Sequence, residues 1–304
     1  MKHSFIATML DPTQLQTLAA VVREGSFERA AARLHVTPSA VSQRVRALEE
    51  RVGAVLVQRG QPCVATELGD RLCRHAQTLA LLEQQLRLDL PGGAAAEGER
   101  PLLRVAVNAD SLGTWFVSAV RALGDEPGLL LDMASADQDQ TAAWLRRGQV
   151  LAAVTAQAQA VPGCRVQRLG VLRYRAVCSP DFHARWFSRG VDAAALGRAP
   201  SLLFDRDDQL QLRWVRRLLR REPVLPAHRL PSVEGFLAAA LQGVGWGLNP
   251  EAMVRPHLAA GRLCELVPGR PLDVTLYWQV ADLALPALDR LSAAVQQAAR
   301  AALA

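Results

Sequence analysis

The stretch TPSAVSQRVRALEERV, residues 37–52, has the pattern of a single amphipathic helix. Its apolar side chains recur at steps of four, three and four, the period of a buried helix face. These side chains are Val41, Val45, Leu48 and Val52. Thr37 followed by Pro38 predicts the helix start, because the hydroxyl can cap and proline is tolerated in the first turn. The opposite face is polar and carries no acidic residue before Glu49, so this is either an ordinary surface helix or one that enters the DNA major groove.

Two further helical segments precede this one. PTQLQTLAAVVR (12–23) places apolar residues on one face, and SFERAAARLHV (26–36) carries small alanines that permit close packing. Two compact helices joined by a short turn, the second with a polar outer face, have helix-turn-helix spacing. The segments 54–57 and 59–64 then predict two short strands around a turn, a β-wing with Arg59 at its edge.

The segment 66–91 predicts a long helix with a heptad seam. The seam residues are Leu68, Leu72, His75, Leu79, Leu82 and Leu86. A solitary helix of this length seldom carries such a stripe without a partner, so we expect a homodimer. Packing on the chain's own second domain is the alternative. The small, charged run from Pro91 to Pro101 predicts a hinge over 92–101.

Beyond the hinge, strand and helix patterns alternate. The predicted strands are 102–108, 128–134, 150–155, 174–179, 201–204, 245–249 and 274–280. The predicted helices include 112–123, 141–147, 210–219 and 233–242. Such alternation predicts a parallel sheet flanked by helices. The segment 102–304 is long enough for two α/β lobes with a cleft between them.

The composition excludes several classes of protein. The 304 residues contain no apolar run of eighteen, so no membrane span is expected. The opening MKHSFIATML is too short and too weakly apolar for a secretory signal. The five cysteines have no metal spacing, and their odd number argues against a disulfide framework and for a reduced cytoplasm.

The net charge of +6 is not by itself an argument for DNA binding. Residues 1–101 hold twelve basic and eleven acidic side chains, whereas residues 102–304 hold twenty-three and eighteen. The excess of positive charge therefore lies outside the predicted helix-turn-helix. DNA binding has to be argued from where the charges lie.

The segment SFERAAARLHVTPSAVSQRVRALEERVG (26–53), followed by a short wing and ATELGDRL (65–72), resembles LysR-type transcriptional regulators. The resemblance implies an α+β multidomain fold with an N-terminal winged helix-turn-helix, a long linker helix and a two-lobed α/β effector domain like periplasmic binding proteins. The implied divisions are 1–65 for the winged helix-turn-helix, 66–91 for the linker and dimerisation helix, 92–101 for the hinge, and 102–304 for the effector domain, with lobe I about 102–170 and 267–304 and lobe II about 171–266.

Four short motifs resemble one branch of the family, ArgP and LysG, which sense arginine or lysine and control export of basic amino acids. They are AVNADSLGTW (106–115), LRRGQVLAAVT (145–155), LFD (203–205) and LYW (276–278). The wing departs from the branch, since GQPCVA (60–65) replaces a more proline-rich stretch. The resemblance implies a cytoplasmic, nucleoid-associated dimer or tetramer, with promoter DNA and RNA polymerase as partners and no cofactor or metal.

Hydroxyl and amide side chains on the polar face of 37–52 suit the base edges of the major groove. Gln43 can pair with adenine through its donor and acceptor. Arg46 and Arg59 suit phosphates or a groove, whereas Arg44 faces sideways and is either a contact or a solvated charge. The helix starts at Ser26 and Thr37 favour phosphate. The predicted DNA-contacting residues are Ser26, Thr37, Pro38, Ser39, Ser42, Gln43, Arg44, Arg46 and Arg59.

An effector is expected where strands end and helices begin, in the crevice of the α/β lobes. Carboxylates there would attract a cationic ligand, and hydroxyls with backbone amides would hold its carboxylate. Trp115 either walls the pocket or packs in the core, and each carboxylate is alternatively a helix cap or a solvated loop acid. The predicted effector residues are Asn108, Asp110, Ser111, Thr114, Trp115, Thr155, Gln157, Asp205 and Glu234.

Catalytic motifs find no support. The glycines of GVGWG (243–247) precede a strand instead of opening a helix, so a dinucleotide loop is not indicated. No G-x-S-x-G and no histidine pair with zinc spacing occurs, so a regulator and not an enzyme is expected. Two alternatives stay open: a LysR-type regulator with a different small effector, and an architectural chromosome-binding factor without one.

Overall fold

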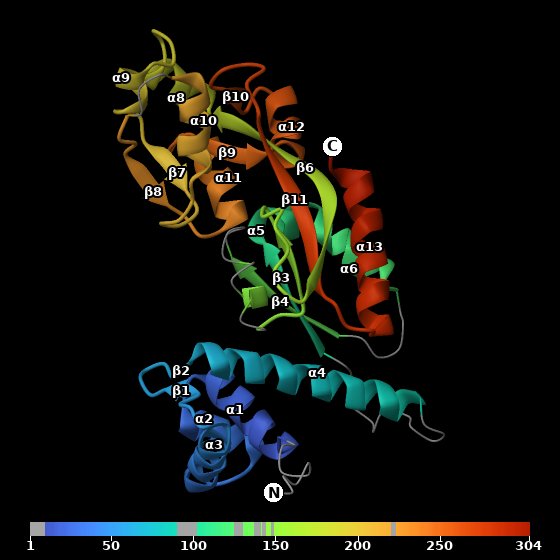
Figure 1. The fold of residues 1–304 in the computed structure, drawn as a ribbon. Helices are drawn as coiled ribbons and strands as arrows, with labels where there is room; N and C mark the ends of the chain where they lie inside the picture. Colours follow the sequence, from blue (N-terminus) through green and yellow to red (C-terminus); the bar gives the residue numbers. More distant parts are fainter. Residues whose placement is uncertain are drawn as a thin grey trace, which may run out of the picture.

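The computed structural model describes residues 10–89, 102–124, 130–136, 141, 144–146, 149–219 and 223–304. The N-terminal helices lie beside one long helix, and the rest of the described chain forms two lobes joined by continuous strands (Figure 1). The predicted hinge over 92–101 lies outside the described residues. No described helix has both the length and the apolar character that a membrane crossing requires.

Three helices make up the N-terminal bundle: α1 (Pro12–Glu24), α2 (Phe27–Leu34) and α3 (Pro38–Val52). Each begins at a side-chain cap, because Asp11, Ser26 and Thr37 accept backbone amides of the first turn. Their apolar faces share one core, to which α3 contributes Val41, Val45 and Leu48. The apolar face and the start of α3 are as the sequence predicts.

The wing is the antiparallel pair β1 (Val57–Gln58) and β2 (Val64–Ala65), shorter than the two predicted segments. The long helix α4 (Glu67–Asp89) follows it and packs against α1. The helix begins at the predicted place because the Thr66 hydroxyl accepts the amide of Gly69 at 3.1 Å.

The heptad seam of α4 has two parts. Leu68, Leu72 and Leu79 pack on the N-terminal core of the same chain. Leu82 and Leu86 are 45% and 59% exposed, and His75 is exposed as well. The first part of the seam is thus used within the chain, and the predicted partner helix stays a prediction that concerns the second part.

Among the described residues the two lobes share a seven-stranded sheet in the order β10-β6-β11-β5-β3-β4, with β9 also paired to β6. Its strands are β3 (Leu102–Asn108), β4 (Leu130–Ala136), β5 (Ala152–Thr155), β6 (Cys164–Cys178), β9 (Gly247–Pro250), β10 (Cys264–Glu265) and β11 (Leu272–Ala281). β6 and β11 are long and run through both lobes (Figure 1). A second, parallel pair is formed by β7 (Ser201–Leu203) and β8 (Ala227–Arg229).

The large sheet is mixed, which corrects the prediction of a parallel sheet. β3 pairs in parallel with β4 and β5, whereas β11 is antiparallel to both β5 and β6. β6 also starts at Cys164, well before the predicted strand 174–179. Antiparallel neighbours need no crossover helix, so the alternation of strands and helices along the chain does not reveal them.

Helices cover the sheet and fill the second lobe. They are α5 (Ala109–Ser111), the π-helix η1 (Leu112–Phe116), α6 (Val117–Ala122), α8 (Pro180–Trp186), α9 (Ala193–Leu196), α10 (Leu210–Leu218), α11 (Val233–Leu241), α12 (Glu251–Ala259) and α13 (Pro286–Ala302). The predicted helix 112–123 is therefore divided, and 141–147 is helical at its described positions 141 and 144–146. One apolar core extends through both lobes and includes Trp214, Trp246 and Trp278.

Candidate functional site

The outer face of α3 is polar and accessible. Ser39 and Gln43 are exposed, and Ser42 is half-buried beside them. The Thr37 hydroxyl accepts the amide of Ala40 at 3.2 Å and lies 2.9 Å from the Ser39 hydroxyl. Short hydroxyl groups and one exposed amide side chain therefore occupy the first two turns, where a groove-binding helix contacts base edges.

The acidic residue that ends this polar face points away from it. The Glu49 carboxylate accepts the backbone amides of Leu56 and Val57 at 2.8 and 3.3 Å, which ties α3 to the wing. Pro38 is the first residue of α3, and Ser26 caps α2 while donating to Glu28 at 2.6 Å. The helix-turn-helix thus keeps its negative charge off the first turns of α3.

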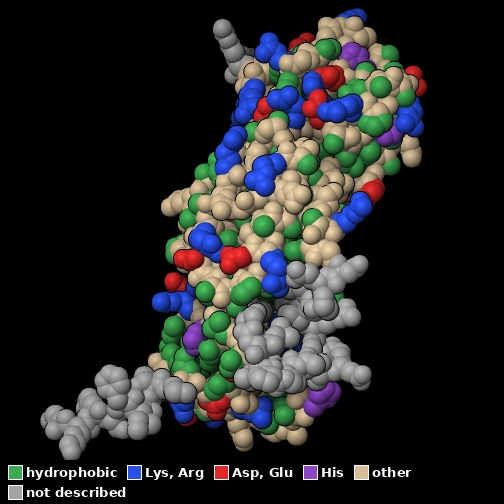
Figure 2. Space-filling model, turned by 90° about the vertical axis from the view of Figure 1, so that its right-hand side faces the viewer, with side chains coloured by type: hydrophobic (Ala, Val, Ile, Leu, Met, Phe, Trp, Pro, Cys, Tyr) green, Lys and Arg blue, Asp and Glu red, His purple; other side chains and the backbone are tan. Residues whose placement is uncertain are grey.

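Basic side chains flank the outer face. Arg46 is 79% exposed and lies 3.7 Å from Glu50, an exposed pair that contributes little to stability. Arg59 is exposed at the wing, with its guanidinium carbon 5.0 Å from the centre of the Phe27 ring. Arg44 is half-buried, which fits the predicted sideways position. On the face of the molecule shown in Figure 2, basic and acidic side chains are interspersed over the lobes.

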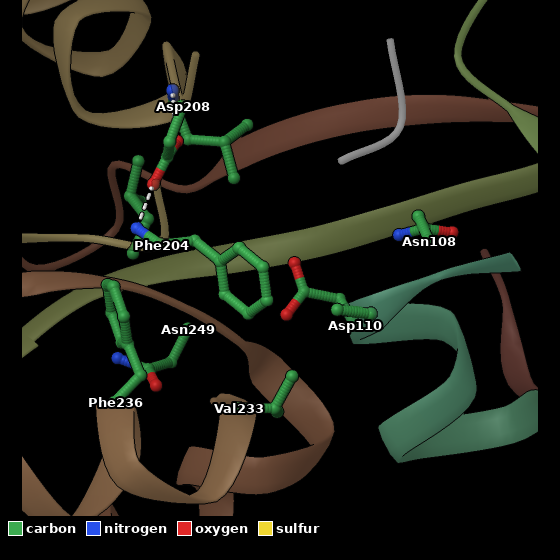
Figure 3. A pocket seen from close by; sticks show the side chains of 10 residues that line it. Asn108, Asp110, Phe204, Asp208, Val233, Phe236 and Asn249 are labelled. Atoms are coloured by element: carbon green, nitrogen blue, oxygen red, sulfur yellow. Dashed lines mark hydrogen bonds between the residues drawn. The ribbon is translucent and has the colours of Figure 1, made fainter. Parts of the chain in front are cut away.

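A pocket lies between the two lobes (Figure 3). It is lined by Asn108, Ala109, Asp110, Phe204, Asp208, Leu210, Val233, Phe236, Leu248 and Asn249. The end of β3 and the start of α5 supply one wall. The segment after β7, the first turn of α11 and β9 supply the other. The walls approach closely, since a Cβ atom on Gly113 would lie 3.3 Å from Cγ1 of Val233.

The carboxyl group of Asp110 points into this pocket (Figure 3). The buried Tyr174 hydroxyl, from β6, donates to its Oδ2 atom at 2.7 Å. Burial raises the pKa of Asp110 to about 6, the Tyr174 hydrogen bond lowers it, and the charge of Asp208 raises it. A cation beside Asp110 would favour the ionised form, because an opposite charge within a few ångströms offsets desolvation.

Asp208 is the second carboxylate of the pocket and is not among the residues predicted from the sequence. It is 7% exposed and accepts the amides of Phe204 and Leu210, each at 2.9 Å. Burial raises its pKa, while those amide hydrogen bonds lower it. The predicted Asp205 instead accepts the amides of Asp207 and Asp208 at 2.8 and 3.0 Å, so it shapes the turn and does not line the pocket.

Two amide side chains of the pocket have unused hydrogen-bonding atoms. Oδ1 of Asn108 and Nδ2 of Asn249 are buried without a hydrogen-bond partner. Buried polar atoms are nearly always paired, and leaving one unpaired costs roughly 1–3 kcal/mol. An acceptor and a donor therefore stand ready for a polar ligand, between apolar walls that include Phe204, Phe236 and Leu248.

The remaining predicted effector residues lie outside the pocket lining. Ser111 is fully buried, and Trp115 packs in the core with its ring centre 5.6 Å from that of Phe116, which favours the core alternative. The Thr114 hydroxyl donates to the backbone oxygen of Asp110. Glu234 is exposed in the first turn of α11 and accepts the hydroxyl of the cap residue Ser232 at 3.3 Å, which favours the solvated-acid alternative.

Thr155 and Gln157 belong to the sheet side of lobe I. Thr155 is fully buried and accepts the amide of Gln157 at 3.1 Å, and the backbone oxygen of Gln157 accepts Nε2 of Gln279 at 3.0 Å. Of the predicted effector residues, the structure thus places Asn108 and Asp110 in the pocket lining. Asn249, which sequence reasoning missed, ends a predicted strand, and the strand-end argument applied to Asn108 would have found it.

Comparisons with known proteins agree with this architecture. Residues 12–70 match the family described as "Bacterial regulatory helix-turn-helix protein, lysR family", and residues 96–300 match "LysR substrate binding domain". The chain is 47% identical over 293 residues to the HTH-type transcriptional regulator LysG of Mycobacterium tuberculosis, an alignment that covers 95% of this chain and 94% of that protein.

Solved structures resemble the whole chain as well. ArgP from Mycobacterium tuberculosis matches with a TM-score of 0.84 and 46% identity, over 97% of this chain and 99% of that one. Full-length LysG from Corynebacterium glutamicum with bound effector Arg matches with a TM-score of 0.76 and 38% identity, over the same shares of the two chains. The chain therefore belongs to the LysR family of bacterial transcriptional regulators, in its LysG and ArgP branch.

Proposed function

We propose that the effector of this regulator is a basic amino acid, arginine or lysine, bound between the lobes. The observation that carries the proposal is that Asp110 lines one apolar pocket together with Asn108 and Asn249, each of which has a buried amide atom without a partner. The cationic group of the ligand lies beside the Asp110 carboxylate and compensates for its burial. The ligand carboxylate accepts a hydrogen bond from Nδ2 of Asn249. The aliphatic stem of arginine or lysine packs against Phe204 and Phe236. LysG from Corynebacterium glutamicum, a relative, was solved with arginine as effector.

The proposal for DNA assigns base contacts to the outer face of α3 and phosphate contacts to its surroundings. Gln43, Ser39 and Ser42 read base edges in the major groove. Thr37, Pro38 and Ser26 lie at helix starts, where backbone amides favour phosphate. Arg44, Arg46 and Arg59 bind phosphates or enter a groove.

We also propose the division of the chain and its assembly. The winged helix-turn-helix takes residues 1–65, the linker helix 66–91, the hinge 92–101 and the effector domain 102–304. Leu82 and Leu86 of one chain pack on α4 of a second copy, because both are apolar and about half exposed. Effector binding changes the angle between the lobes and so the placement of two winged domains on DNA.

In the cell, the proposed setting is the cytoplasm, at the nucleoid. The proposed target is the promoter of a basic amino-acid exporter, with RNA polymerase as the partner there. The proposed role is that of a regulator and not of an enzyme, since the relative LysG of Mycobacterium tuberculosis is an HTH-type transcriptional regulator.

Calorimetric titration with arginine, lysine, leucine and glutamate tests the effector. We expect saturable binding of arginine or lysine only, with a large loss of affinity in Asp110→Asn and a smaller loss in Asp208→Asn. Asp181→Asn, which removes an exposed carboxylate of α8, is the matched control and should bind as the wild type does. Absence of arginine and lysine binding would refute the basic-effector proposal and leave family membership untouched.

Sedimentation of a Leu82→Asp, Leu86→Asp double variant tests the assembly. Charges at the proposed helix contact should dissociate the dimer. Val224→Asp, at a loop valine that is 90% exposed, is the control and should sediment as the wild type. A double variant that stays dimeric would place the interface elsewhere.

A further inference from the structure

Two cysteines lie opposite each other on neighbouring strands of lobe II, away from the effector pocket. Cys178 ends β6 and Cys264 begins β10, and the two are register partners in the antiparallel ladder. Directly opposed residues of such a ladder have Cα atoms roughly 4.5–5.5 Å apart and side chains on the same face. That separation lies within the range of roughly 4.4–6.8 Å found for disulfides.

Both cysteines are free thiols. The Cys264 thiol donates to the backbone oxygen of Cys178 at 3.6 Å. The side-chain hydrogen bond from Cys178 lowers the pKa of Cys264, while the same bond, followed by burial, raises the pKa of Cys178. Cys264 thus loses its proton more readily than Cys178 and is the better nucleophile of the pair.

The difference in solvent exposure also favours Cys264 as the residue that reacts first. Cys178 is fully buried in the core of the two lobes, whereas Cys264 is half-buried at the start of the short strand β10. A small oxidant therefore reaches Cys264 first. Cys178 is placed to resolve the product, because it is the register partner of Cys264 and is itself shielded from solvent.

We propose that Cys178 and Cys264 are a site of reversible oxidation, at which a peroxide converts the two thiols into a cross-strand disulfide. The Cys264 thiolate attacks hydrogen peroxide, the O–O bond breaks, and a sulfenic acid forms while the departing hydroxide takes up the thiol proton as water. The Cys178 sulfur then attacks the sulfenic sulfur. The S–S bond forms, the S–O bond breaks, and the hydroxide leaves with the Cys178 proton as water.

In this reaction, the two thiols lose two hydrogen atoms and one peroxide is reduced to two waters. The disulfide would fasten β10 to β6. It is independent of the proposed effector, because neither cysteine lines the pocket.

The test treats the reduced full-length protein with hydrogen peroxide, blocks free thiols with N-ethylmaleimide, and identifies peptides by mass spectrometry before and after dithiothreitol. We expect an intact protein that has lost two hydrogen atoms, and a Cys178–Cys264 peptide pair that dithiothreitol separates. Cys178→Ser should stop at the sulfenic acid on Cys264, trapped with dimedone. Cys63→Ser, at a buried cysteine of the wing, is the matched control and should form the bond normally.

Two results would overturn the proposal. One is oxidation of Cys264 to sulfinic acid in the wild type while Cys178 remains alkylated as a free thiol. The other is disulfide formation between a different pair of the five cysteines. The Cys178→Ser variant is compared with the wild type by circular dichroism, so that a folding defect is separated from a missing resolving thiol.

Discussion

The outer face of α3 and the pocket around Asp110 are both polar sites, yet they are built in opposite ways. The α3 face comes from one run of sequence, and Ser39, Gln43 and Arg46 are exposed on it. The pocket comes from segments as far apart as Asn108 and Asn249, and its polar atoms are buried. Water screens charges at the first site and is largely excluded at the second, so salt should control DNA binding and pH should control effector binding.

The largest effect is expected from Asp110→Asn in the pocket. Removing one partner of a buried charge pair costs about 2–5 kcal/mol of binding, so arginine or lysine affinity should fall at least about thirtyfold in calorimetry. The thermal midpoint of the effector-free variant should rise, because a carboxylate that burial disfavours is gone. If the variant binds arginine normally, the cation of the effector does not bind at Asp110.

The same carboxyl group gives the pocket its pH dependence. With the folded pKa of Asp110 raised to about 6, the proton binds as pH falls through that value. Affinity for a cationic amino acid should therefore be steady above pH 7 and decline below pH 6. For the effector-free protein the sign is opposite, since the folded state holds a proton that the unfolded chain has lost, and stability should fall as pH rises from about 4 to about 6.

Gln43→Ala on α3 comes second in size. A bidentate contact to one base is worth about 1–3 kcal/mol of discrimination, so specificity should relax at one position of the operator. Selection from a randomised duplex library, with wild type and variant in parallel, measures this change. Gln16→Ala, at an exposed glutamine of α1, is the control. A loss of affinity that is equal for all operator sequences would indicate that Gln43 contacts a phosphate instead of a base.

Tyr174→Phe should have a smaller, pH-dependent effect. Loss of its hydrogen bond, worth about 1 kcal/mol, raises the pKa of Asp110 further. Effector affinity should then fall several-fold near pH 6.5 and recover by pH 8.5 in titrations at both values. Tyr277→Phe removes the other tyrosine hydroxyl of the chain and should leave the profile unchanged. An equal loss at both pH values would indicate a packing role.

Arg46→Ala should have the smallest effect on affinity. It tests whether salt controls DNA binding at the exposed face of α3. One lost phosphate contact weakens binding to all sequences alike and lowers the slope of log affinity against log salt by about 1. Arg121→Ala removes the same charge from α6 and should leave the slope as it was. Fluorescence anisotropy at four salt concentrations measures both. A changed base preference in Arg46→Ala would assign it to base reading.

The sequence alone was enough for the helix-turn-helix because each of its signals is local. A cap such as Thr37 hydrogen-bonds within three residues, and a buried face such as Val41, Val45 and Leu48 repeats at the helical period. Such patterns do not depend on the rest of the chain. The antiparallel strand pairs could not be predicted from such local patterns, because paired residues of β6 and β11 are about a hundred positions apart in the sequence.

The pocket shows most clearly what only the tertiary structure decided. Asp205 and Asp208 stand three residues apart in one polar turn, and local sequence does not tell which of them faces inward. Asp205 bonds back to its own turn, while the packing of β7 and α10 buries Asp208. Strand register and the meeting of the two lobes bring Tyr174 to Asp110 and place Asn249 in the same pocket lining as Asn108. Side-chain direction at such a junction depends on long-range packing, which no local periodicity encodes.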